Sequence, residues 1–93
     1  MSEFRPARHP QQAIQAKLNY FLGADEYDRL FAGFEVLHVD NNVLTVCVQS
    51  EHTAEVQSKY SWHVAIVAEA ILKQAVHRVN VVPLEECNAS RAQ

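Results

Sequence analysis

Five histidines are the side chains best suited to bind a metal or to transfer protons near neutral pH. They are scattered along the chain, at His9, His38, His52, His63 and His77. Metal sites built on a helix place two histidines one turn apart, and structural zinc sites commonly use a Cys-x-x-Cys pair. Neither spacing occurs here. We therefore predict no metal site and interpret the histidines as ordinary surface or half-buried residues.

The two cysteines, Cys47 and Cys87, are the next candidates for chemistry. Cys47 falls in a strand-like segment with neither a glycine-flanked turn nor a helix N-terminus to lower the pKa of its thiol. It is interpreted as a small apolar filler or as an inert surface thiol. Because two cysteines are too few for a disulfide framework, we expect free thiols and a reducing compartment.

Carboxylate pairs and phosphate-binding loops give no catalytic signal either. Asp25-Glu26 and Glu85-Glu86 are adjacent in sequence, and adjacent side chains on a helix point in different directions. The glycine patterns that cradle phosphates, G-x-x-x-x-G-K-[ST] and G-x-G-x-x-G, are absent. The sequence therefore predicts a non-enzyme without a cofactor.

The charge distribution bears on partners and location. Eight Lys and Arg against eleven Asp and Glu give the 93-residue chain a net charge of −3, and no Lys or Arg occurs between Leu30 and Ser58. Nucleic-acid binding normally needs a dense basic face, so it is disfavoured. No apolar run approaches the ~20 residues that span a bilayer, and the polar start lacks a signal-peptide core. We expect a cytoplasmic protein with no membrane contact.

Two amphipathic helices are expected first. From Pro10, the spacing of Ile14, Leu18, Phe21 and Leu22 predicts a helix that ends at Gly23. A shorter helix follows over Ala24–Ala32. Asp25, Glu26 and Asp28 lie in its first turn, where the helix dipole favours carboxylates. Its apolar stripe consists of Tyr27, Leu30 and Phe31.

A hairpin follows, because the apolar period changes to two. Phe34–Asp40 and Val43–Gln49 are rich in β-branched residues and flank the turn Asp40-Asn41-Asn42. In the second strand we assign one face to the core (Leu44, Val46, Val48) and the other to the outside (Thr45, Cys47, Gln49). In the first strand, the pattern does not identify which face belongs to the core, because Phe34 and Val36 lie on one face and Leu37 and Val39 on the other. Both faces are therefore expected to be partly covered.

A long helix and a last strand complete the pattern. Ser50 is a suitable N-cap, and helical spacing continues from Glu51 to Ala75, roughly 37 Å, which leaves room for a bend near Ser61. His77–Leu84 then alternates as a strand. These elements predict a two-layer α+β fold of order α-α-β-β-α-β, with helices on one face of a three-stranded sheet, as in KH-like domains. We expect a flexible arm at 1–9, one domain at 10–84 and a flexible tail at 85–93.

The segment from Ala16 to Tyr60 resembles the N-terminal domain (domain I) of the bacterial replication initiator DnaA. The shared features are a first amphipathic helix, a short helix with Tyr27 three residues before Leu30-Phe31, Gly33-Phe34, an Asp-Asn hairpin turn, and a long helix carrying Lys59-Tyr60. The chain departs from that family in three places. Its first helix lacks a Trp, Leu30 replaces a Trp in the second helix, and Gln49-Ser50 replaces Pro-Asn.

The resemblance implies a non-catalytic module of replication initiation that docks the replicative helicase, the initiator or a regulator. On this chain the implied docking residues are Glu26 with its neighbour Asp25, and His52 with the preceding Ser50. Weak self-association is implied for the exposed side of the first helix, at Gln11, Gln12 and Gln15.

Two alternatives remain open beside this interpretation. A KH-like nucleic-acid-binding domain would use a G-x-x-G loop, but the only glycines are Gly23 and Gly33. A purely structural homodimer would use the first helix. The aromatic residues suited to an interface are Trp62, Tyr20 and Tyr27. Tyr27 and Tyr60 are assigned to the core, whereas Trp62 lies off the main stripe of its helix and is left undecided.

Overall fold

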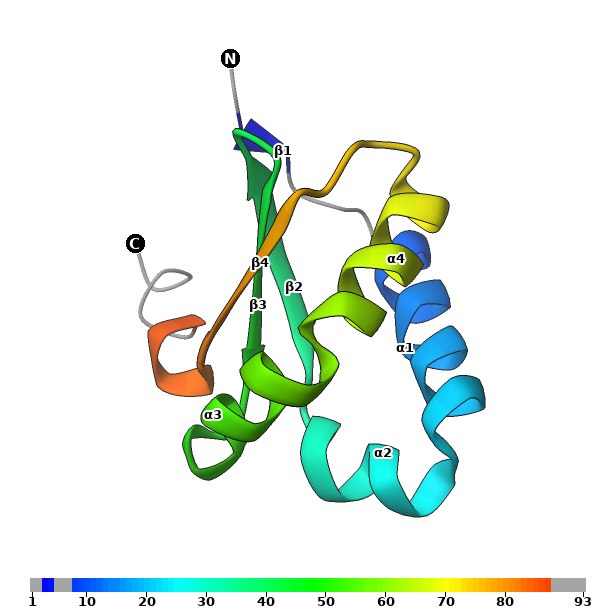
Figure 1. The fold of residues 1–93 in the computed structure, drawn as a ribbon, viewed down its shortest axis with the longest axis vertical. Helices are drawn as coiled ribbons and strands as arrows, with labels where there is room; N and C mark the ends of the chain where they lie inside the picture. The colour runs from blue at the N-terminus through cyan, green and yellow to red at the C-terminus, as the bar shows by residue number, and fades with distance from the viewer. Residues whose placement is uncertain (1–2, 5–7, 88–93) are drawn as a thin grey trace.

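Helices cover one face of a mixed β-sheet in the computed structural model, which describes residues 3–4 and 8–87 (Figure 1). None of the helices in these ranges is long and apolar enough to cross a membrane. The elements, in chain order, are β1 (Glu3–Phe4), α1 (Arg8–Leu22), α2 (Ala24–Phe31), β2 (Glu35–Asp40), β3 (Val43–Val48), the 3-10 turn η1 (Ser50–His52), α3 (Thr53–Glu55), the π-helical turn η2 (Val56–Tyr60), α4 (Ser61–Leu72) and β4 (Arg78–Pro83).

The sheet has the strand order β1-β2-β3-β4. β2 pairs antiparallel with β3, and β3 pairs parallel with β4. The predicted α+β fold with three main strands and helices on the sheet is confirmed. The addition is β1, which pairs with β2 from within the segment predicted as an arm. In addition, α1 begins at Arg8, two residues before Pro10. The rest of that arm, and the tail from residue 88, lie outside the described residues.

A β-bulge explains why the two faces of β2 could not be told apart. Val36 lies opposite Val46 and Val39 lies opposite Leu44, with a register shift between Val36 and His38. The extra residue moves Val39 onto the face of Val36. Both valines are therefore buried among the helices, at 6% and 1% exposure.

The outer face of β3 is covered, contrary to the prediction for Thr45 and Cys47. Cys47 is fully buried and forms a disulfide with Cys87, which ends a helical turn formed by residues 84–87. This turn lies across the sheet from α1 and α4 (Figure 1). The prediction of free thiols is thus wrong, and it no longer supports the expected reducing compartment. Two cysteines 40 positions apart in sequence carry no pairing signal of their own.

The long helix is interrupted at the expected place. The apolar stripe continues through Val56, Val64 and Val67, all at most 3% exposed. However, the backbone passes through η2 and leaves helical geometry at Tyr60, with φ −123° and ψ 3°, before α4 begins at Ser61. A π-helical turn of this kind shifts the register of the following helix. Because of this shift, the apolar residues of η2 and those of α4 both face the core.

The inner side of α1 is rotated relative to the predicted stripe. Ile14 and Leu18 are fully buried as expected, but Phe21 is 58% exposed. On the inner side lie Gln11 and Gln15 instead, and both bond to the backbone at the start of β2. Gln11 Oε1 accepts from Val36 N–H at 3.2 Å, and Gln15 Nε2 donates to Phe34 O at 2.9 Å. Phe21 lies on the exposed side of α1.

Candidate protein-docking site

Glu26, the acidic residue implied in docking, is held by two partners of this chain. It stands in the first turn of α2, where the helix dipole favours a carboxylate. Arg29 contacts it with two nitrogens, Nη2 to Oε2 at 3.0 Å and Nε to Oε1 at 3.3 Å. Tyr60 donates its hydroxyl to Oε2 at 2.7 Å. The carboxylate is therefore held in position by two side chains of the same chain.

Arg29 also joins α2 to the segment that starts at Ser50. Its Nη2 lies 2.8 Å from Glu55 Oε2, and its Nη1 lies 3.3 Å from Glu55 Oε1. Lys59 Nζ is 3.4 Å from the same Glu55 Oε2. We call Glu26, Arg29, Glu55, Lys59 and Tyr60 the α2–α3 cluster. Its two carboxylates and two cations balance in charge, so it is a polar connection and not an acidic patch.

The hydrogen bonds of the cluster shift the pKa values of its members. Arg29 lowers the pKa of Glu26, and the Tyr60 hydroxyl adds to that effect. Arg29, assisted by Lys59, lowers the pKa of Glu55 to about 2. The hydrogen bond to Glu26 raises the pKa of the Tyr60 hydroxyl. The lowered pKa values favour the ionised carboxylates of Glu26 and Glu55, and the raised pKa of Tyr60 keeps its hydroxyl protonated as the donor to Glu26.

The other implied docking residues lie beside this cluster. Asp25 is exposed next to Glu26. His52 is half-buried one turn before Glu55, and its Nε2 lies 3.9 Å from a carboxylate oxygen of Glu51. His52 thus precedes Glu55 of the cluster by three residues along the 50–60 segment.

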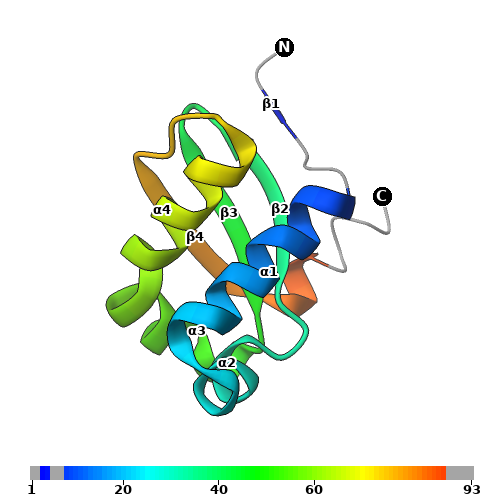
Figure 2. The same cartoon turned by 90° about the vertical axis from the view of Figure 1, so that its right-hand side faces the viewer.

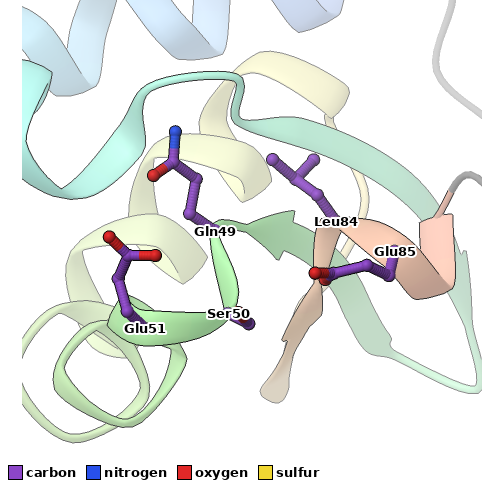
Figure 3. Close-up of a pocket in the computed structure, with 5 residues that line it drawn as sticks. All are labelled: Gln49, Ser50, Glu51, Leu84 and Glu85. Atoms are coloured by element: carbon purple, nitrogen blue, oxygen red, sulfur yellow. The ribbon is translucent and has the colours of Figure 1, made fainter.

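Ser50 opens a shallow pocket of about 270 Å³ at the other end of that segment. The pocket is bounded on one side by Gln49, Ser50 and Glu51, and on the other by Leu84 and Glu85 (Figure 3). The two carboxylates stand on opposite walls (Figure 3). Its second wall is the helical turn that the disulfide ties to β3, so the tether also shapes the surroundings of Ser50.

The residues implied in self-association are divided by the structure. Gln12 is exposed, whereas Gln11 and Gln15 are partly buried and bonded to β2. The outer side of α1 instead presents Tyr20 at 80% and Phe21 at 58% exposure, with Lys17 Nζ 5.8 Å from the centre of the Phe21 ring. The expectation of Phe21 in the core is wrong.

A groove adjoins this outer side of α1. It has a volume of about 510 Å³, extends to α4, and is lined by Ala13, Ala16, Lys17, Tyr20 and Ile71. The sequence signal for this groove is the set Ala13, Ala16, Lys17 and Tyr20 on α1. It was missed because the apolar stripe of α1 was taken as its only interacting side. An exposed aromatic beside a groove is typical of an interface.

A second exposed aromatic group lies on α4. Trp62 is 72% and Ile66 is 48% exposed, which settles the position of Trp62 outside the core. Trp62 borders a groove of about 210 Å³ between α4 and the start of β4.

The remaining chemistry is sparse. Within residues 3–4 and 8–87, no three His, Cys, Asp or Glu side chains are grouped so as to hold a metal ion. No family model matches the chain, and no curated protein matches it. Any assignment therefore depends on the residues and surfaces described above.

Proposed function

We propose that this protein is a non-catalytic protein-interaction module of DNA replication initiation, which docks the replicative helicase, the initiator or a regulator. The proposal starts from the resemblance to domain I of DnaA. The observation that carries it is the bridge of Arg29 between Glu26 and Glu55. Through this bridge, the two segments implied in docking, the start of α2 and the segment after Ser50, form one continuous surface.

The mechanism follows from the fixed geometry of that surface. Arg29 and Tyr60 already hold the Glu26 carboxylate, so little side-chain entropy is lost when a partner donates further hydrogen bonds to it. Asp25 and His52 extend the surface on either side with exposed or half-exposed polar groups. A partner whose face donates hydrogen bonds is complementary to this charge-balanced surface.

An NMR titration of the labelled chain with the replicative helicase, and separately with the N-terminal domain of the initiator, tests the proposal. We expect perturbations around Glu26 and His52, and a loss of affinity in Glu26→Ala. The matched control is Asp28→Asn, an exposed acid on the same helix. Thermal unfolding of each variant separates lost docking from lost folding. Unchanged binding by Glu26→Ala and His52→Ala would show that this surface is not the docking site. The absence of spectral changes with both proteins would refute the replication role.

Self-association is the second candidate, favoured by the exposed aromatics of α1. We infer that Tyr20 and Phe21, with the groove beside them, form the contact between two copies of the chain. Sedimentation velocity over a range of concentrations tests this. A concentration-dependent dimer that Tyr20→Ser abolishes is expected, with Trp62→Ser as the control. A monomer at all concentrations would refute it.

A further inference from the structure

The backbone of β4 is the outer edge of the sheet that the described residues form, and one side chain already pairs with it. β4 is the last strand in the order β1-β2-β3-β4, and Figure 2 shows it beside α4, at the side of the sheet away from β1. Gln57 Nε2 donates to Val79 O at 2.8 Å, and Gln57 Oε1 accepts from Val81 N–H at 2.9 Å.

These two bonds have the pattern of strand pairing. In a parallel ladder, one residue donates its N–H to the carbonyl before its opposite residue and accepts from the N–H after it. The Gln57 amide does this opposite Asn80. An unpaired edge strand recruits other chains, and the amide occupies the position where such a chain would bind. The geometry therefore shows that an amide group fits at this edge.

The groove beside the edge supplies two further features of a peptide site. Its described lining is Gln57, Ser61, Trp62, Ala65, His77, Arg78 and Val79. Trp62 is largely exposed and offers an apolar surface to a side chain. Arg78 is exposed, and this lining contains no Asp or Glu, although the whole chain has a net charge of −3. Gln57 itself belongs to the π-helical turn η2, an irregularity that recurs at functional sites.

We propose that the β4 edge is a strand-addition site for a short, extended, acidic segment of a partner protein. The segment lies parallel to β4 and displaces the Gln57 amide from Val79 and Val81. One of its apolar side chains packs on Trp62, and a carboxylate pairs with Arg78. Gln57 satisfies the edge when the segment is absent. This surface is separate from the α2–α3 cluster, so the inference goes beyond the proposed docking function and does not depend on it.

The observations favour a peptide over a single-stranded nucleic acid, which would also use an aromatic platform and a cation. A nucleic acid would stack a base on Trp62 and place a phosphate against Arg78, as a peptide would place an apolar side chain and a carboxylate there. Only a peptide backbone replaces both bonds of Gln57 with a donor and an acceptor at strand spacing. The fate of the Gln57 amide therefore distinguishes the two ligands.

The test begins with selection of binders from a random peptide library displayed on phage against the whole chain, with counter-selection against a Trp62→Ala/Arg78→Glu double variant. We expect acidic peptides with one apolar anchor. In ¹⁵N spectra, the selected peptide should shift the side-chain NH₂ signals of Gln57 and the backbone amide of Val81. Failure to enrich any peptide, or a peptide that leaves these signals unchanged, overturns the proposal.

Variants then test the mechanism. Gln57→Ala removes the competing amide, so we expect the selected peptide to bind severalfold more tightly. Trp62→Ala and Arg78→Glu should each weaken binding severalfold, and Asn19→Ala, which changes an exposed amide side chain on α1, is the unchanged control. N-methylation of the peptide residue opposite Asn80 should abolish binding, because it removes the donor to Val79 O. Equal binding of the methylated peptide refutes strand addition. Binding of an oligodeoxythymidine at this groove, without any peptide binding, assigns the groove to nucleic acid instead.

Discussion

Reduction of the Cys47–Cys87 disulfide is expected to lower the free energy of unfolding by about 4 kcal/mol. The bond joins residues 40 positions apart. The chain-entropy relation for a closed loop of that length gives about 13 cal/mol/K, hence about 4 kcal/mol at 25 °C. A domain of 93 residues has a total stability of roughly 5–14 kcal/mol. The reduced chain should therefore remain folded, with roughly 1–10 kcal/mol of stability left.

Urea denaturation followed by circular dichroism, with and without a dithiol reductant, measures this difference. A thiol titration under denaturing conditions verifies that two thiols form on reduction. A double variant, Cys47→Ala/Cys87→Ala, should unfold at the same midpoint with and without reductant and serves as the control. The m-value should also rise on reduction, because the unfolded chain becomes less compact. Equal unfolding free energies for the oxidised and fully reduced chains would refute the reasoning.

Three other perturbations test the packing and the α2–α3 cluster. Leu18→Ala should cost ~2–5 kcal/mol, because the side chain is fully buried; an unchanged denaturation midpoint would contradict the position of α1. Gly33→Ala should destabilise the chain, since Gly33 has φ 78° and a Cβ there would lie 3.2 Å from Leu84 Cδ1, and calorimetry would show a lower melting temperature. Glu55 has a pKa lowered to about 2 by Arg29, so its contribution is complete above its unfolded pKa of ~4.3 and is lost as pH falls toward 2. Glu55→Gln should flatten the pH dependence of stability in that interval, and an identical pH profile for the variant would exclude the ion pair as its cause.

Apolar spacing was sufficient to predict most elements and much of the core. The stripes that contain Ile14, Leu18, Leu30 and Phe31 are buried as expected. The Asn41-Asn42 turn has the positive φ values that a tight hairpin requires. Each of these features depends on residues within a few positions of one another, and local periodicity is the signal that one sequence displays most directly.

Residues that act through distant partners could not be predicted in the same way. Gln11, Gln15 and Gln57 look like solvent-facing polar residues, yet each bonds to backbone groups of a strand more than 18 positions away. Glu26 was selected as a docking residue, but its bonds to Arg29 and Tyr60 become visible only in three dimensions. A hydrogen bond between residues far apart in the chain produces no periodic pattern in the sequence.

The sequence by itself determined α1, α2, the strands β2, β3 and β4, the turn between β2 and β3, and the α+β class, because hydrophobic period and turn chemistry act locally. Tertiary structure decided the bulge at β2, the disulfide between Cys47 and Cys87, the rotation of α1 that exposes Phe21, and the pairing of Gln57 with the β4 edge. These features arise when the packed elements must satisfy buried polar groups and fill volume together. That requirement applies to the assembled chain and to none of its segments alone.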